Sequence, residues 1–214
     1  MKKEINYTLL SDGSSDRMLM PIITWSLKQN LGQDVLIQPD WANLYHASAN
    51  LDLYKKINYS LDKFPCDILF VHRDSEKKSE SVVQERKQEI EDAWINSVKN
   101  SEKYVPVIPI RMSEAWLLVD ELAIRSASGN PNSTIPIQFP KISRLESLPN
   151  PKEILEALIR KASGLRGRNL KKLNVDKAKH RVAEHIVDFS PLKRLTAFQT
   201  FESDLKSVLL GLYK

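Results

Sequence analysis

The chain of 214 residues contains only one cysteine, Cys66, and four histidines, and both scarcities limit what it can be. One cysteine cannot form an intramolecular disulfide, and because Cys66 begins an apolar stretch we expect a buried, unreactive thiol. No apolar run approaches the roughly 18 residues that span a membrane, and the first residues lack the apolar core of a secretory signal. These absences predict a soluble, cytoplasmic protein with no membrane partner.

Acidic residues are scarce in the second part of the chain. Residues 1–126 carry 16 Lys and Arg against 19 Asp and Glu, a net charge of −3, whereas residues 127–214 carry 16 against 8, a net charge of +8. An acidic part followed by a basic part is typical of a carboxylate site next to a polyanion-binding surface. An ordinary solvated basic surface is the alternative.

One short apolar run ends abruptly in acidic residues. Residues 67–71 are rich in aliphatic and aromatic side chains, which favours a strand buried on both faces of a parallel sheet. Asp74 and Glu76 follow it, two residues apart, so their side chains can project the same way from an extended segment. Ligands of open α/β sheets bind beyond the carboxyl ends of the strands. Two adjacent carboxylates repel each other unless a cation joins them, so this strand end is a candidate site.

The neighbouring residues alternate between strand and helix patterns. Strand patterns lie at residues 5–10, 34–38 and 104–110. Helix patterns lie at residues 15–31, 50–63 and 79–100, and at 113–125 with Ser113 as the cap. The prolines in the last strand predict that it is short or at an edge. The alternation predicts an α/β fold, with a mostly parallel sheet flanked by helices.

The second part of the chain has a helical pattern. Residues 127–151 are polar and rich in proline, which predicts a linker or a functional loop. Further helix patterns lie at residues 151–163, 176–186 and 192–213. We therefore expect an α/β domain at 1–126, this linker, and a basic C-terminal helical subdomain at 152–214.

Acidic residues follow three of the four predicted strands at their carboxyl ends. They are Asp12 and Asp16 after the first strand, Asp74 and Glu76 after the third, and Glu114, beside Arg111, after the fourth. Carboxylates without a His or Cys cluster select hard cations, so we expect Mg²⁺ or Mn²⁺, with Asp12, Asp16, Asp74 and Glu76 as ligands. Such an ion can hold a phosphodiester, generate a hydroxide and stabilise the leaving oxygen, while Arg111 or Arg73 adds positive charge. The expected catalytic residues are Asp12, Asp74, Glu76, Glu114 and Arg111. A helix cap or a surface role is the alternative for each carboxylate alone, above all for Asp16.

Three segments carry a resemblance to a known family. Asp-Gly-Ser-Ser-Asp at 12–16, His-Arg-Asp-Ser-Glu at 72–76 and Arg-Met-Ser-Glu-Ala-Trp-Leu-Leu at 111–118 resemble the Toprim fold, especially the small Toprim-like proteins of bacterial defence loci. The resemblance covers about residues 5–126. It implies a Rossmann-like fold and a Mg²⁺-dependent nuclease or related phosphoryl-transfer enzyme acting on DNA or RNA, in anti-phage defence or repair. It also implies a partner ATPase or a homo-oligomer. Any use of ATP would need a second protein, because the chain has no Walker A or GxGxxG motif.

Two positions depart from the Toprim pattern. Asp12 stands where Toprim proteins usually carry Glu, and Glu76 stands where they usually carry Asp. Each exchange changes the reach of the carboxylate by one methylene group. The alternative to a nuclease is therefore a non-catalytic Toprim-like subunit that binds nucleic acid or a partner ATPase.

Residues 160–181 have a net charge of +8. Phosphate contacts need this density of cations, and Gly164 and Gly167 let the backbone approach closely. The expected nucleic-acid-binding residues are Arg166, Arg168, Lys171, Lys172, Lys179 and Arg181. A solvated pair of helices is the alternative. Trp41 and Tyr45, after the second strand, are candidates for stacking on a base, and His72 is a candidate general base or a structural residue.

Overall fold

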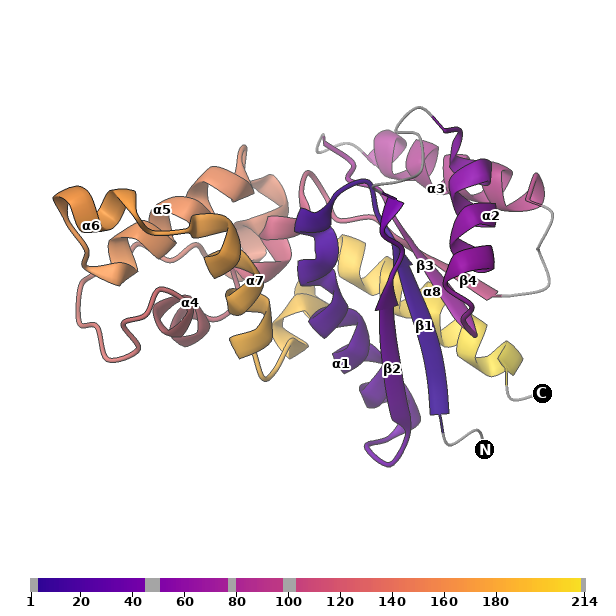
Figure 1. Ribbon diagram of the computed structural model, residues 1–214, viewed down its shortest axis with the longest axis horizontal. Helices are drawn as coiled ribbons and strands as arrows, with labels where there is room; N and C mark the ends of the chain where they lie inside the picture. Colours follow the sequence, from indigo (N-terminus) through magenta and orange to yellow (C-terminus); the bar gives the residue numbers. More distant parts are fainter. Residues whose placement is uncertain (1–3, 45–50, 77–79, 98–102, 213–214) are drawn as a thin grey trace.

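The computed structural model describes residues 4–44, 51–76, 80–97 and 103–212. Four parallel strands form one sheet in the order β2-β1-β3-β4 (Figure 1). The strands are β1 (Glu4–Leu10), β2 (Leu36–Trp41), β3 (Ile68–His72) and β4 (Lys103–Val107). The predicted α/β fold with a helix-flanked sheet is confirmed, and the proline-bearing β4 is both short and at an edge.

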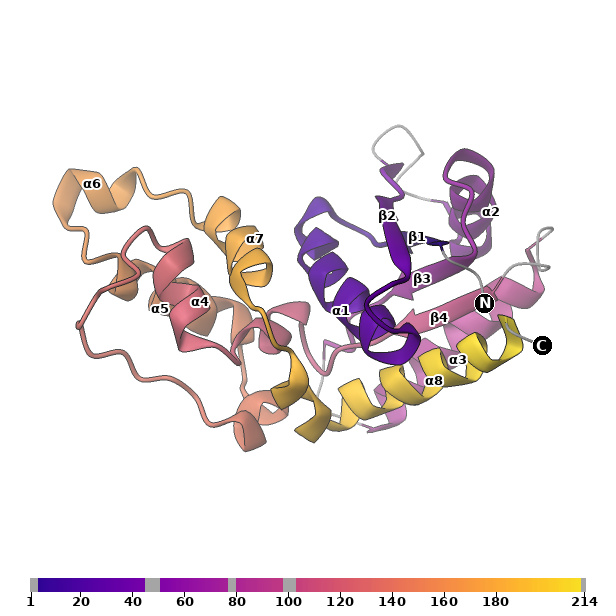
Figure 2. The same cartoon turned by 90° about the horizontal axis from the view of Figure 1, so that it is seen from below.

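Helices cover both faces of the sheet, and the side chains of each strand point alternately to the two faces. Ile68 and Phe70 of β3 enter one hydrophobic core, and Leu69 and Val71 enter the other. The first core is covered by α1 (Met20–Leu31) and α8 (Thr196–Leu212), the second by α2 (Leu53–Lys63) and α3 (Glu80–Ile95). Figure 2 shows α8 lying along the sheet. This double burial explains why β3 is the continuous apolar run that the sequence displays.

Two predicted helices are interrupted. The chain after β1 first forms a 3₁₀ helix, η1 (Ser14–Leu19), and α1 begins only with Pro21 in its first turn. Proline has no N–H and its ring would clash with the preceding turn of a continuous α-helix, so the α-helix starts there. The helix predicted at 113–125 is likewise divided into η3 (Ser113–Leu117) and α4 (Glu121–Ala127). Asp120 caps α4 by accepting a hydrogen bond from the Ala123 N–H at 3.0 Å, whereas the N-cap position of η3 is Met112 and not the predicted Ser113.

The helical part contains α4, α5 (Pro151–Ser163), α6 (Gly167–Lys171) and α7 (Val175–His185), with the short turns η4 (Ile142–Ser147) and η5 (Ser190–Arg194). The predicted ends of α5 are confirmed: Asn150 accepts from the Glu153 N–H at 3.2 Å, and Gly164 is left-handed with φ of 67°. The segment predicted as a linker is tied down by Arg125, whose guanidinium donates to the carbonyls of Ser133 at 2.7 Å and Ile135 at 3.0 Å.

The helical part and the sheet share one continuous hydrophobic core. α8 belongs to the segment 152–214 that was expected to form a separate subdomain, yet it packs against β4. Its Phe198 ring lies 5.3 Å from Trp116 of η3, and its Phe201 ring lies 6.2 Å from Phe70 of β3. Figure 1 shows that the part from α4 to α7 projects from the sheet.

The second strand differs from its prediction. β2 ends at Trp41, which is paired with Leu9 of β1, so Trp41 closes a strand and does not lie in a loop. Tyr45, the other stacking candidate, lies outside the described residues, as does the end of the helix predicted at 79–100. Among the described helices, none is both long and apolar enough to cross a membrane.

Candidate active site

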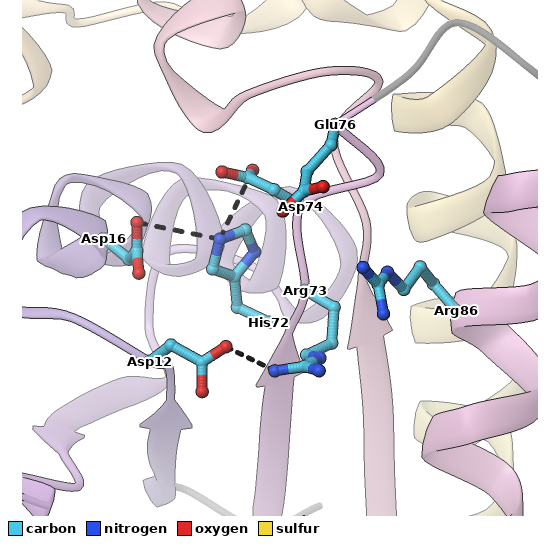
Figure 3. A pocket seen from close by; sticks show the side chains of 7 residues that line it. All are labelled: Asp12, Asp16, His72, Arg73, Asp74, Glu76 and Arg86. Carbon is cyan, nitrogen blue, oxygen red and sulfur yellow. Dashed lines mark hydrogen bonds and ion pairs between the residues drawn. The ribbon is translucent and has the colours of Figure 1, made fainter. Parts of the chain in front are cut away.

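A pocket of about 200 Å³ lies at the carboxyl ends of β1 and β3 (Figure 3). Its lining combines four carboxylates with one histidine and two arginines: Asp12, Asp16, His72, Arg73, Asp74, Glu76 and Arg86. Asp12 follows β1, Asp16 lies on η1, and Arg86 lies on α3. The other four residues lie at the end of β3 or directly after it. The four carboxylates that the sequence assigned to a metal therefore line one pocket, as expected for parallel strands that end at the same edge.

Asp12 is held by cations on both of its oxygens. Lys56 of α2 donates to Oδ1 at 2.8 Å, and the Arg73 guanidinium donates to Oδ2. Arg73 also donates to Glu89 of α3 at 2.6 Å, and Arg86 donates to the other oxygen of Glu89 at 2.8 Å. Burial works to raise the pKa of Asp12, but Lys56 and Arg73 together hold it below its ordinary value. Asp12 is therefore an ionised member of an ion-pair chain.

His72 presents one nitrogen to two carboxylates. Its Nδ1 lies 3.0 Å from the carbonyl oxygen of Val107, and because a carbonyl only accepts, Nδ1 carries the hydrogen. Its Nε2 lies 3.5 Å from Oδ1 of Asp74 and 3.7 Å from Oδ1 of Asp16 (Figure 3). In the neutral ring Nε2 is an acceptor, so three acceptor atoms face one another. A proton or a metal cation is needed to join them.

Asp74 is the carboxylate with the most perturbed environment. Burial raises its pKa to about 6, and the negative charges of Asp16 and Glu114 act in the same direction, against the lowering effects of His72 and the Ser113 backbone N–H. Its oxygen Oδ1 is buried and has no hydrogen-bond partner among the described residues. An ionisable group in a cleft whose pKa is shifted by burial and by identified neighbouring charges marks a candidate functional residue.

Asp74 should make the stability of the protein depend on pH. The folded-state pKa of about 6 lies above the ordinary value of 3.8, so the stabilising effect of protonation is complete below pH 4 and is lost as the pH rises through 6. With a chelator present, Asp74→Asn should be more stable than the wild type at pH 8, by at most about 3 kcal/mol. Near pH 4 the two proteins should unfold at similar urea concentrations. A difference that does not change with pH would contradict this origin.

The segments that follow β3 and β4 hold each other in an unusual backbone geometry. Glu76 and Arg111, with φ of 58° and 66°, are the non-glycine residues with positive φ in the described chain. The Glu76 N–H donates to the Arg111 carbonyl at 3.0 Å, and the Arg111 N–H donates to Oγ of Ser75 at 2.8 Å. Left-handed backbone is rare outside glycine and recurs at functional sites. These two hydrogen bonds fix the position of Glu76 at the rim of the pocket.

Two predicted catalytic residues lie outside the pocket. Arg111 turns away and donates to the Pro149 carbonyl at 3.3 Å. Glu114 is buried, and its Oε1 lies 3.7 Å from Nζ of Lys179. Glu114 therefore acts on the pocket only through its charge, which raises the pKa of Asp74.

Lys179 does not fit its predicted role in nucleic-acid binding. It is 4% exposed, and its Nζ lies 2.9 Å from Asp176 and 3.5 Å from Glu156, in addition to Glu114. It forms an internal ion cluster between α7, α5 and η3. The sequence placed it correctly on a basic helix but could not show that this helix turns one cation inward. The other predicted contacts differ, since Arg166, Arg168, Lys171 and Lys172 are exposed and Arg181 is half-buried.

The predicted metal ligands line the same pocket, but they do not form a metal-binding group. No group of three or more His, Cys, Asp or Glu side chains in the described residues is placed to hold a metal ion. One reason is that both oxygens of Asp12 are taken by Lys56 and Arg73. Mg²⁺, however, is commonly bound by one or two carboxylates, waters and a substrate phosphate. Oδ1 of Asp74, which accepts no hydrogen bond from the described residues, can be a metal ligand in that mode of binding.

Sequence reasoning missed the residues that helices bring to the site. Lys56, Arg86 and Glu89 lie on α2 and α3, whose charged positions look like ordinary solvated faces. The ion pairs that they form with strand-end residues join parts of the chain up to 44 residues apart, as between Asp12 and Lys56, and no local pattern signals them. Comparisons of the chain with protein-family models, with curated proteins and with solved structures found no match.

Proposed function

We propose that the pocket binds a phosphodiester of nucleic acid and cleaves it with Mg²⁺ or Mn²⁺, in a Toprim-like variant of the α/β fold. The observation that carries this proposal is the meeting of Nε2 of His72 with the Oδ1 atoms of Asp16 and Asp74. Oxygen ligands favour a hard cation, and the unpartnered oxygen of Asp74 offers it a place.

The charge of the pocket indicates that a phosphate enters together with a cation. The lining holds four carboxylates against two guanidinium groups, a net charge of −2 while His72 is neutral. A phosphodiester is itself an anion, so the pocket without a cation repels it. A divalent ion removes this repulsion, and metal and substrate should therefore bind together.

The residues of the pocket can divide the work of hydrolysis. Asp74 and Asp16 would hold the ion, which supplies charge for the transition state and an activated water. Arg73 and Arg86, now paired through Glu89, can turn to the phosphate oxygens as bidentate donors. His72 is fixed through Nδ1, so its Nε2 can accept a proton from the attacking water where Asp74 and Asp16 alone hold the ion and leave this nitrogen without a metal.

Millimolar Mn²⁺ should raise the melting temperature of the wild type, because it binds the native state and relieves repulsion between carboxylates. Asp74→Ala should show a much smaller rise, measured by differential scanning fluorimetry at pH 7.5. Asp188→Ala, which removes an exposed carboxylate far along the chain, is the matched control and should respond like the wild type. An equal rise in the Asp74→Ala protein would place the bound metal elsewhere.

A non-catalytic subunit is the second candidate, and the ion pairs of Asp12 favour it. Asp12 is engaged by Lys56 and Arg73, which suits a fold that keeps its strand-end carboxylates for structure. The direct test is the incubation of labelled DNA and RNA with the wild type in Mg²⁺ or Mn²⁺, with and without chelator. Cleavage that the chelator stops supports the enzyme. No cleavage of either nucleic acid in either metal, including in the presence of a partner ATPase encoded nearby, supports the subunit.

A further inference from the structure

The surface of α6 and its flanks is strongly cationic. Four exposed basic residues, Arg166, Arg168, Lys171 and Lys172, lie within seven positions, and the five residues of α6 contain no acidic side chain. Two residues after this group, Asn174 caps α7 by accepting from the Lys177 N–H at 2.9 Å. The chain that carries these cations therefore leads directly into α7, whose first turn holds Asp176, paired with Lys179, and the exposed Lys177.

One face of α7 carries the positive charge onward. Lys177, His180 and Arg181 stand at positions i, i+3 and i+4, which are neighbours on a helix surface. Lys177 is exposed, and the other two are half-buried. The acidic residues near this face are Asp176, which is paired with Lys179, and Glu184, one turn further along.

The α7 face ends beside the pocket. α7 packs against η1, the 3₁₀ helix that contains both Asp16 and Arg17. Arg17 is exposed and follows Asp16, a pocket residue. Its guanidinium also lies over the Trp41 ring, 5.2 Å from the centroid. Cations thus lead from α6 to the edge of the catalytic pocket.

Both views of the fold show the same order in space. In Figures 1 and 2, α6, α7 and the N-terminal end of α1 follow one another from the outer end of the molecule towards the sheet. α6 has 5 residues and α7 has 11, so at 1.5 Å per residue they are roughly 8 Å and roughly 17 Å long. A stacked strand advances about 3.4 Å per nucleotide, so contact with both helices needs a strand of several nucleotides.

We propose that Arg166, Arg168, Lys171, Lys172, Lys177, Arg181 and Arg17 form one cationic track that holds the nucleic-acid strand beside the scissile phosphate. The inference rests on the proposed function, because the track would bring its ligand to that pocket. It adds that the helical part selects substrates by length. Strands that end at the pocket miss these contacts, whereas strands that extend several nucleotides beyond it can make them.

The track can be tested by binding alone, in the cleavage-deficient Asp74→Asn background with a chelator present. Fluorescence anisotropy would measure affinity for single strands of 4, 8 and 12 nucleotides at several salt concentrations. We expect affinity to rise with length up to about 8 to 12 nucleotides. Replacing Arg166, Arg168, Lys171 and Lys172 by Ala should weaken 12-nucleotide binding at least about tenfold, flatten the salt dependence and remove the length dependence.

A matched control removes four exposed cations elsewhere, on or beside η4, η5 and α8: Lys141, Arg144, Arg194 and Lys206. A smaller variant, Lys171→Ala with Lys172→Ala, should show part of the loss and guards against misfolding of the larger one. A loss no greater than that of the control, or equal affinity for polyglutamate of the same charge, would overturn the track. If the track fails this test but the wild type still cleaves nucleic acid, the proposed function stands without the track. If the track binds nucleic acid but the wild type does not cleave it, the proposed function is wrong and the track stands.

Discussion

Asp74→Asn should lower the rate of nucleic-acid cleavage in Mg²⁺ or Mn²⁺ by about a hundredfold or more. Asp74 is the pocket carboxylate whose Oδ1 is buried without a hydrogen-bond partner, so it has a free site for an ion. Asparagine keeps the shape and the acceptor for the Ser113 N–H but removes the charge that the ion needs. The substitution therefore separates electrostatics from packing.

Folding should survive this change, and at pH 8 it should improve, because the charge that is costly to bury has gone. Binding to the cationic track should change little, since different residues make it. Asp34→Asn, an exposed carboxylate in the turn before β2, is the matched control and should retain full activity. A wild type that cleaves while Asp74→Asn cleaves equally well would remove Asp74 from the mechanism. A wild type that cleaves nothing would favour the non-catalytic subunit.

The sheet could be predicted because its signals are local. β3 is apolar at every position from Ile68 to Val71 since both faces are covered, and this burial is visible in the sequence. The ends of α5 were equally visible in Asn150 and Gly164. The divided helices were not predicted, because the helical periodicity runs on through Pro21 and Asp120. Each of these residues begins a new α-helix, Pro21 because it lacks an N–H and Asp120 as a side-chain cap.

The pocket could be predicted only on its strand side. Parallel strands end at one edge, so Asp12, Asp74 and Glu76 had to lie near one another. What the sequence could not show is the direction from which cations arrive. Arg73 pairs with Asp12 across 61 residues of chain, and this choice depends on the packing of α2 and α3 against the sheet. These ion pairs decide whether Asp12 stabilises the fold or takes part in a reaction. The role of Asp12 is therefore harder to predict from the sequence than its position.

Helix packing also turns Lys179 inward, and its ion pairs lead to a stability prediction. Lys179→Met should lower the free energy of unfolding by about 3 kcal/mol, measured by urea denaturation at pH 7. The side chains of Lys179 and Glu114 are 5% and 7% exposed, and their charged atoms lie 3.7 Å apart. Burial alone would lower the pKa of Lys179, but Asp176 and Glu114 raise it overall, so the ammonium group is charged in the native state. Methionine fills the space of the stem and leaves Glu114 as a buried charge without its cation.

The variants around this ion cluster identify the source of the loss. Lys177→Met, two residues away on the exposed side of α7, should change stability by no more than about 0.5 kcal/mol. Adding Glu114→Gln to Lys179→Met should recover part of the loss, because the unpaired charge is then removed. The recovery would show that the cost comes from the unpaired carboxylate and not from lost packing. A Lys179→Met protein as stable as Lys177→Met would mean that Lys179 is solvated in solution, and its predicted contact with phosphate would regain its basis.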